Sequence, residues 1–223
     1  DEINILFRMY SNQQWGNYSA SYKVARASGD YKKPVWFRGG MVDTQRKNPE
    51  GGNFTMRLYS RVFQDLVVGE AYANGCIRVF NLANEGVGGP EPDYEHRKPF
   101  FQRFADYADM INAHRAAFID RKNAAEVAVV YSISTQVWED FSSLNIALEN
   151  HYPRFMGWTR ALEQLHMPYQ VVIFGHPKLF PNEKMLERLS QYEVLVLPGV
   201  NCMTKAQAKA VKEFVDNGGT LVY

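Results

Sequence analysis

The segment YEVLVLPGVNCMTKAQAKAVKEFVDNGGTLVY, residues 192–223, holds a strand, a helix and a second strand in close succession. Residues 193–197 form a short apolar run, which indicates a buried strand. Residues 205–216 are predicted to be helical, because Asn217, Gly218 and Gly219 then follow as a typical helix end. Residues 220–223 begin another strand. Two strands joined through a helix predict a parallel sheet with helical crossovers.

The same pattern recurs upstream of this segment. Residues 126–131 (EVAVVY) and 170–174 (QVVIF) are predicted strands, and helices are predicted at 154–165 and 182–189. Residues 132–152 form an unusually long connection for such a fold. The α/β pattern therefore predicts a flavodoxin-like, doubly wound parallel sheet from about residue 123 onward.

The first half of the chain also alternates between strand-like and helix-like segments. The predicted strands are residues 3–10, 34–38 and 76–80. Three helices are predicted. The first is residues 18–29. The second is about 20 residues long, includes Leu58 and ends near residues 74–75, and the third is residues 99–119, with Pro99 at its first position. Residues 39–53 are rich in Gly, Pro and Asn and are predicted to form a loop. This order predicts a second parallel sheet.

The segments AAEVAVVYS (124–132), YPRFMGWTRALEQLHMPYQVVIF (152–174) and residues 192–223 resemble the class I glutamine-amidotransferase-like, or trimerisation, domain of family 42 β-galactosidases. ANGCIRVFNL (73–82) is similar to the last strand of the TIM barrel that precedes this domain in those enzymes. The resemblance implies that residues 1–122 are the C-terminal βα units of a TIM-barrel-like glycosidase domain and that residues 123–223 are a truncated amidotransferase-like domain. A longer parent protein would hydrolyse O-glycosidic bonds.

Barrel enzymes place their chemistry at the C-terminal ends of strands, which directs attention to polar residues at these points. Amides and an arginine can bind sugar hydroxyls, and an aromatic ring can cover the apolar face of a sugar. The predicted substrate-binding residues of this kind are Asn12, Gln13, Gln14, Trp15, Arg38 and Asn81. The alternative is that residues 11–16 simply form a polar turn.

Retaining glycosidases need two carboxylates about 5–5.5 Å apart. Related hydrolases carry a glutamate in an E-x-Q-x-G-like stretch, and the similar SNQQWG (11–16) has Asn12 at that place. Glu85 is the predicted catalytic carboxylate, and Asp43, Glu91 and Asp93 are weaker candidates. Because an amide is neither a glycosyl nucleophile nor a useful acid, a carbohydrate-binding pseudoenzyme is a second hypothesis.

Two further binding residues come from the long connection of the second domain. In the resembling enzymes the comparable loop approaches the barrel mouth or a neighbouring subunit, which implies that Trp138 and His151 contact the ligand face of the barrel. No G-x-C-x-G elbow is present, so amidotransferase chemistry is not expected. Cys202 precedes a predicted helix, which leaves an independent thiol enzyme as a third hypothesis.

The balance of 25 basic and 24 acidic side chains, with a formal charge of +1, gives no reason to expect a nucleic acid or an anionic membrane as partner. Two cysteines without C-x-x-C spacing predict neither a metal site nor a cofactor. The start DEINILF lacks the features of a signal peptide, so the compartment is unassigned. The resemblance implies a carbohydrate ligand and a homo-oligomer, either trimer or dimer.

Overall fold

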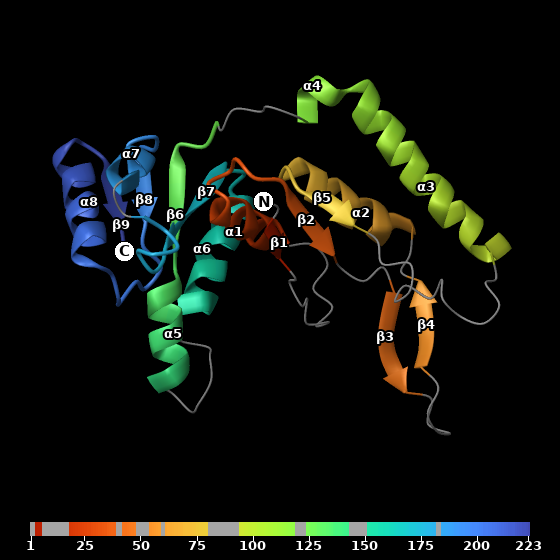
Figure 1. Cartoon of the computed structure of the whole chain (residues 1–223), viewed down its shortest axis with the longest axis horizontal. Helices are drawn as coiled ribbons and strands as arrows, with labels where there is room; N and C mark the ends of the chain where they lie inside the picture. Colours follow the sequence, from red (N-terminus) through yellow and green to blue (C-terminus); the bar gives the residue numbers. More distant parts are fainter. Residues whose placement is uncertain are drawn as a thin grey trace. The chain divides into compact units, whose positions relative to one another are not determined.

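The computed structural model describes residues 3–5, 18–38, 42–47, 54–58, 61–79, 94–118, 124–142, 151–181 and 184–223 (Figure 1). The chain divides into two compact units. The first contains residues 1–22 and 32–122, and the second contains residues 23–31 and 123–223. Both units hold parallel sheets, which confirms the predicted α/β class. That the first unit is the end of a TIM barrel stays a prediction.

The parallel sheet of the first unit has three described strands, β1 (Ile3–Ile5), β2 (Val35–Arg38) and β5 (Ile77–Val79). They lie in the order β1-β2-β5, so β2 is in the middle and pairs in parallel with both β1 and β5. Helix α1 (Ser19–Ser28) connects β1 to β2, and helix α2 (Arg61–Ala73) precedes β5. Buried Val35, Val68, Ala71 and Cys76 show where this unit has its apolar interior.

Two predicted boundaries in the first unit were wrong. Residues 39–53 do not form one loop, because β3 (Val42–Lys47) and β4 (Phe54–Leu58) pair as an antiparallel hairpin. The turn-forming residues of this stretch lie mostly in the connection 48–53, and Leu58 ends a strand instead of joining α2. Helix α3 (Tyr94–Ala113) begins five residues before Pro99 and is followed by α4 (Arg115–Phe118). Pro99 lies in the second turn of α3, where it has no N–H to donate to the carbonyl of Glu95, and the helix continues across it.

The sheet of the second unit consists of β6 (Val127–Ser132), β7 (Tyr169–Phe174), β8 (Val194–Val196) and β9 (Thr220–Val222). All four strands are parallel and lie in the order β7-β6-β8-β9. Val129 of β6 pairs with Val171 on one side and with Val196 on the other. The chain therefore adds β7 on one side of β6 and β8 on the other, as the doubly wound prediction requires.

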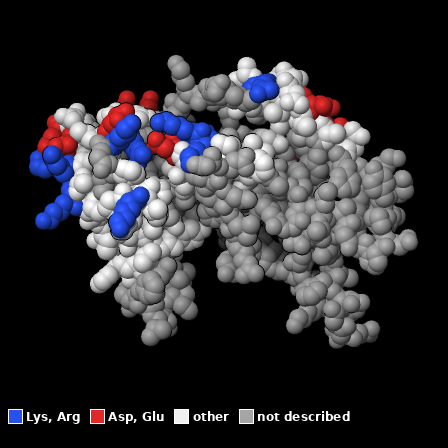
Figure 2. Space-filling view, in the orientation of Figure 1, with Lys and Arg blue, Asp and Glu red and all other residues white. Residues whose placement is uncertain are grey.

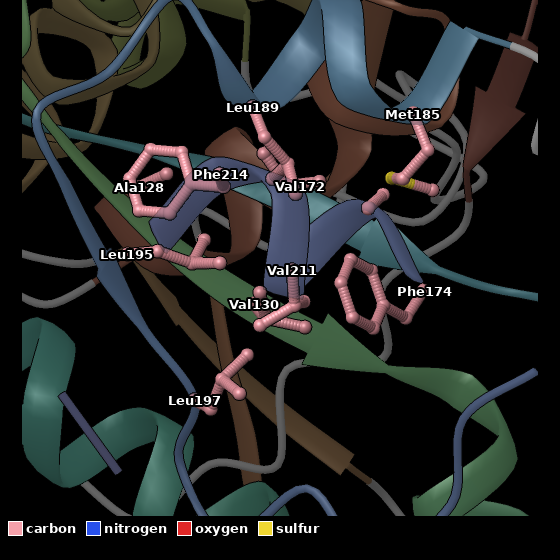
Figure 3. Packing of buried hydrophobic residues seen from close by; sticks show 11 residues of the cluster. Ala128, Val130, Val172, Phe174, Met185, Leu189, Leu195, Leu197, Val211 and Phe214 are labelled. Carbon is pink, nitrogen blue, oxygen red and sulfur yellow. The ribbon is translucent and has the colours of Figure 1, made fainter. Parts of the chain in front are cut away.

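Helices α7 (Met185–Leu189) and α8 (Lys205–Asp216) share a buried core with this sheet (Figure 3). The side chains of Ala128 and Val130 from β6 lie in the same cluster as Phe214 of α8. Valine and alanine side chains two residues apart on a strand point to the same face, so this face of β6 is apolar. The burial of the cluster stabilises the second unit through the hydrophobic effect.

Two parts of the predicted connection 132–152 are helical in the described residues. Helix α5 (Ile133–Ser142) follows β6 directly, and α6 (His151–Gln164) begins three residues before the predicted start at Arg154. Helix α5 contains Ile, Val, Trp and Phe, whose low intrinsic helix propensity hides it from a local prediction. Contacts with α6 and with β7 accompany its formation.

The boundaries of α8 agree with the prediction. The Thr204 hydroxyl accepts a hydrogen bond from the backbone N–H of Gln207 at 3.2 Å, and the Gln207 side chain accepts one from the Thr204 N–H at 2.8 Å. This capping box fixes the start of the helix. Gly218 has φ +98°, a conformation that favours glycine, and fixes its end.

Charged side chains of both signs are interspersed over the described part of the face drawn in Figure 2. On α8, Lys209 pairs with Glu213 at 3.5 Å and Lys212 pairs with Asp216 at 2.5 Å, both four residues apart.

Within the described residues, no helix is both long and apolar enough to cross a membrane.

Candidate functional site

The carboxyl ends of β1, β2 and β5 meet at one edge of the first sheet, because the three strands are parallel. Arg38 is the last residue of β2 and is in register with Val79, the last residue of β5. The predicted sugar-binding residues follow these strands in the sequence. The topology therefore brings the carboxyl ends of β1, β2 and β5, which precede the predicted sugar-binding residues in the sequence, to a common edge.

The side chains of this predicted site lie outside the described residues. This applies to Asn12, Gln13, Gln14, Trp15, Asn81 and Glu85, and also to Glu91 and Asp93. Only the backbones of Arg38 and Asp43 are described, Arg38 at the end of β2 and Asp43 opposite Arg57 in the β3–β4 hairpin. The sugar site stays a prediction.

The second sheet has its own candidate position, the carboxyl edge between β6 and β8. Doubly wound proteins bind ligands at this point, where the order of the strands reverses. Ser132 ends β6, and Pro198 follows β8 by two residues. Polar side chains from α5 and α6 occupy the space between these two strand ends.

His151 at the start of α6 joins the two strand ends. Its ring is fully buried. The Nε2 atom accepts a hydrogen bond from the Ser132 N–H at 2.7 Å, and Nδ1 lies 2.8 Å from the carbonyl oxygen of Pro198. Nδ1 must therefore carry the proton and donate it to Pro198. Burial lowers the pKa of His151 below 6.5, although the Pro198 carbonyl and the nearby Glu139 oppose this shift. The ring is neutral, and both of its nitrogens are engaged.

A second group of hydrogen bonds closes the same edge. The Ser132 hydroxyl donates a hydrogen bond to the Thr135 hydroxyl at 2.9 Å. The Thr135 hydroxyl also accepts a hydrogen bond from the backbone N–H of Cys202 at 2.9 Å. The Glu139 carboxylate accepts from the backbone N–H of His151 and from the Asn201 side chain. These bonds connect α5 and α6 to the segment that follows β8. The ligand position of the fold is filled by the protein's own side chains.

Among the described residues of this edge, Cys202 carries the thiol and His151 the imidazole. Cys202 is a half-buried free cysteine whose backbone groups bond to Thr135. His151 cannot act as the base for the thiol, since neither ring nitrogen is available. The described residues contain no group of three or more His, Cys, Asp or Glu side chains that could hold a metal ion.

Trp138 and His151, which were predicted to touch the same ligand, have very different environments. The Trp138 side chain on α5 is 62% exposed, whereas His151 is 0% exposed. A sugar could reach Trp138 directly but could reach the His151 ring only if its bonds to Ser132 and Pro198 opened. Their binding roles stay predictions.

The sequence reasoning missed the roles of Ser132, Thr135 and Glu139. The signal available was S-x-x-T directly after a buried strand, a spacing that allows two hydroxyls to meet across one helical turn. The partner segments, which contain Pro198 and Cys202, are more than 60 residues away from Ser132 in the sequence. No local pattern identifies them.

The family model of the β-galactosidase trimerisation domain matches residues 125–223. This match covers the entire second sheet. Gan42B, a GH42 β-galactosidase, has a TM-score of 0.66 and 16% identity over 99% of this chain and 32% of its own.

The second unit resembles the β-galactosidase trimerisation domain, and the chain as a whole shares the fold of part of Gan42B.

Other β-galactosidase structures share the fold of this chain. A catalytic mutant of Gan42B from G. stearothermophilus has a TM-score of 0.63 and 17% identity over 99% of this chain and 32% of its own. The β-galactosidase of the psychrophilic Marinomonas ef1 has a TM-score of 0.55 and 12% identity over 97% of this chain and 33% of its own. The chain therefore spans about a third of the length of these enzymes. No curated protein matches it.

Proposed function

We propose that this chain is part of an enzyme that hydrolyses β-galactosides, with one catalytic carboxylate, that of Glu85, in the first unit. The observation that carries this proposal is the trimerisation-domain match over residues 125–223. The fold likeness to Gan42B extends this similarity over 99% of the chain. The second unit contributes structure and assembly, because its ligand position is occupied by His151, Ser132 and Thr135.

In this proposal Glu85 acts as a catalytic carboxylate. Asn12, Gln13, Gln14, Trp15, Arg38 and Asn81 bind the sugar. The location of these residues after β1, β2 and β5 supports their assignment, since barrel enzymes react substrates at the carboxyl ends of their strands. A second carboxylate must come from elsewhere in the protein that carries this chain, because Asn12 cannot supply it.

The test is hydrolysis of an aryl β-galactoside by the protein that carries this chain. We expect turnover in the wild type and a loss of about 10³-fold or more in kcat for Glu85→Gln, within the range for removal of an acid or base. Glu187→Gln, at an exposed position of α7, is the matched control and should keep wild-type kcat. Sugar binding without turnover in the wild type would favour the pseudoenzyme hypothesis instead.

The trimerisation domain indicates homo-oligomerisation, and we propose a trimer as the assembled state. Closed assemblies of identical subunits are the usual outcome when one domain carries its own association surface. Light scattering coupled to size exclusion would give the mass. A mass of three chains supports the proposal, and a mass of one or two chains contradicts it.

A further inference from the structure

Strand β7 lies at an outer edge of the described sheet, since the strand order is β7-β6-β8-β9. Its sequence, YQVVIF, contains no charged residue, no proline and no glycine. The outward N–H and C=O groups of such a strand can pair with another chain. Uncharged, strongly β-forming six-residue segments are also the typical starting points of β-aggregation.

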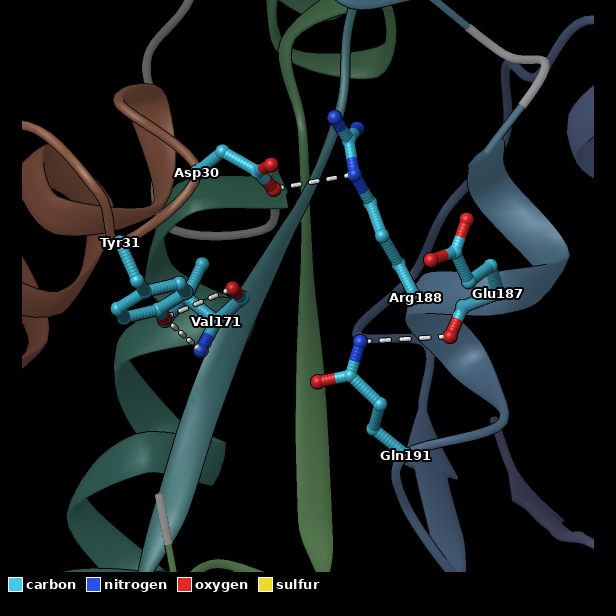
Figure 4. Close-up of polar contacts among 6 residues, drawn as sticks. All are labelled: Asp30, Tyr31, Val171, Glu187, Arg188 and Gln191. Atoms are coloured by element: carbon cyan, nitrogen blue, oxygen red, sulfur yellow. Dashed lines mark hydrogen bonds and ion pairs between the residues drawn. The ribbon is translucent and has the colours of Figure 1, made fainter. Parts of the chain in front are cut away.

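The turn after α1 covers this edge (Figure 4). The Tyr31 hydroxyl donates a hydrogen bond to the Val171 carbonyl at 2.9 Å and accepts one from the Val171 N–H at 2.8 Å. One hydroxyl thus satisfies both backbone groups of a residue in the middle of β7. Burial raises the pKa of Tyr31, so the hydroxyl keeps the proton that it donates.

Further contacts hold the turn against the second unit. The Asp30 carboxylate lies 3.1 Å from Nε of Arg188 on α7. The Lys23 ammonium lies 4.9 Å from the centre of the Tyr169 ring, at the start of β7. Residues 23–31 therefore contact the edge strand and the helix that follows it, which explains why they group with residues 123–223.

The backbone of the turn is strained. Asp30 and Tyr31 have φ values of +55° and +57°, in the left-handed region that residues other than glycine rarely adopt. The Tyr31 N–H bonds to the Arg26 carbonyl at 2.9 Å, and the Arg26 guanidinium donates to the Tyr31 carbonyl at 2.9 Å. Such strain persists where surrounding contacts outweigh it, and this combination is typical of a position with a specific role.

We propose that Tyr31 is a strand-edge cap, which occupies the outer edge of β7 at Val171 and prevents it from pairing with β7 of a second copy of this chain. The cap restricts self-association to other surfaces of the molecule. This inference does not depend on the proposed catalysis.

The test compares Tyr31→Phe with the wild type in the protein that carries this chain. Tyr31→Phe keeps the ring and removes only the hydroxyl. We expect the Val171 amide to exchange its hydrogen about fivefold faster or more, as for loss of one protecting hydrogen bond. We also expect light scattering to show concentration-dependent growth beyond the wild-type mass.

Two control variants separate the cap from other effects. Tyr152→Phe removes the hydroxyl of a tyrosine on α6 whose side chain is 44% exposed, and it should change neither measurement. Asp30→Gly relaxes the turn but keeps the Tyr31 hydroxyl, so it should keep the wild-type mass. An unchanged mass for Tyr31→Phe overturns the proposal, whatever the hydrogen-exchange rate of Val171. An increase in mass for Asp30→Gly as well as for Tyr31→Phe would also overturn it, because the effect would then come from the turn and not from the hydroxyl.

Discussion

The two parallel sheets of this chain differ in strand order and in what lies at their carboxyl edges. In the first unit the order β1-β2-β5 follows the sequence, whereas in the second unit the order β7-β6-β8-β9 reverses at β6. The reversal leaves a ligand position between β6 and β8. His151, Ser132 and Thr135 fill that position with bonds to one another and to the chain. The carboxyl edge of the second sheet is thus cross-linked by hydrogen bonds between side chains and the backbone of neighbouring segments.

The largest expected effect concerns the core of the second sheet. Phe214→Ala removes a side chain that is 4% exposed and lies in the cluster with Ala128 and Val130. We expect a loss of about 3–5 kcal/mol in the free energy of unfolding of the second unit. Urea denaturation followed by circular dichroism would measure it. Leu179→Ala, at a side chain that is 77% exposed, should change stability by less than about 0.5 kcal/mol.

The next effect tests whether the edge between β6 and β8 is structural. His151→Leu leaves the Ser132 N–H and the Pro198 carbonyl buried without their partner. We expect a loss of about 2–4 kcal/mol in the same denaturation experiment, from two unsatisfied polar groups. His176→Leu, at an exposed histidine, is the matched control. Equal effects of the two variants would show that the buried network does not stabilise the unit.

The pH dependence of stability gives a smaller effect with a definite sign. The pKa of His151 is lowered by burial in the folded state, so the unfolded state takes up its proton first as the pH falls. Stability should therefore be full above about pH 6.5 and should decrease below it, by at most about 1.4 kcal/mol per pH unit. Melting temperatures between pH 5 and 8 would show this slope. A slope that persists undiminished in His151→Leu would have to come from other groups.

The smallest expected effect concerns the local signal that begins α8. Thr204→Ala removes one half of the capping box and should lower the free energy of unfolding by about 1 kcal/mol. Lys205→Ala, at the adjacent exposed position, should have little effect. A loss for Thr204→Ala as large as that for His151→Leu would mean that local and long-range contacts stabilise the second unit equally.

The sequence by itself determined the parts of the fold that depend on neighbouring residues. It predicted α8 with its observed bounds, because the cap at Thr204 and the glycine at 218 lie within a few residues of the helix. It also predicted most strands of the second unit, because their apolar runs are continuous. It missed the β3–β4 hairpin, in which β3 contains a single apolar residue, Val42, and the two strands are separated in the sequence by residues 48–53.

The hydrogen-bond partners of His151 and Tyr31 could be identified only from the folded chain. The ligand-binding role predicted for His151 stays a prediction, but the hydrogen-bond partners of its ring, Ser132 and Pro198, are 19 and 47 residues away and were not predicted. Tyr31 drew no prediction, and its partner Val171 is 140 residues away. Hydrogen-bonding side chains gain their roles from groups that folding brings within about 3 Å, and local patterns carry no information on such distant partners.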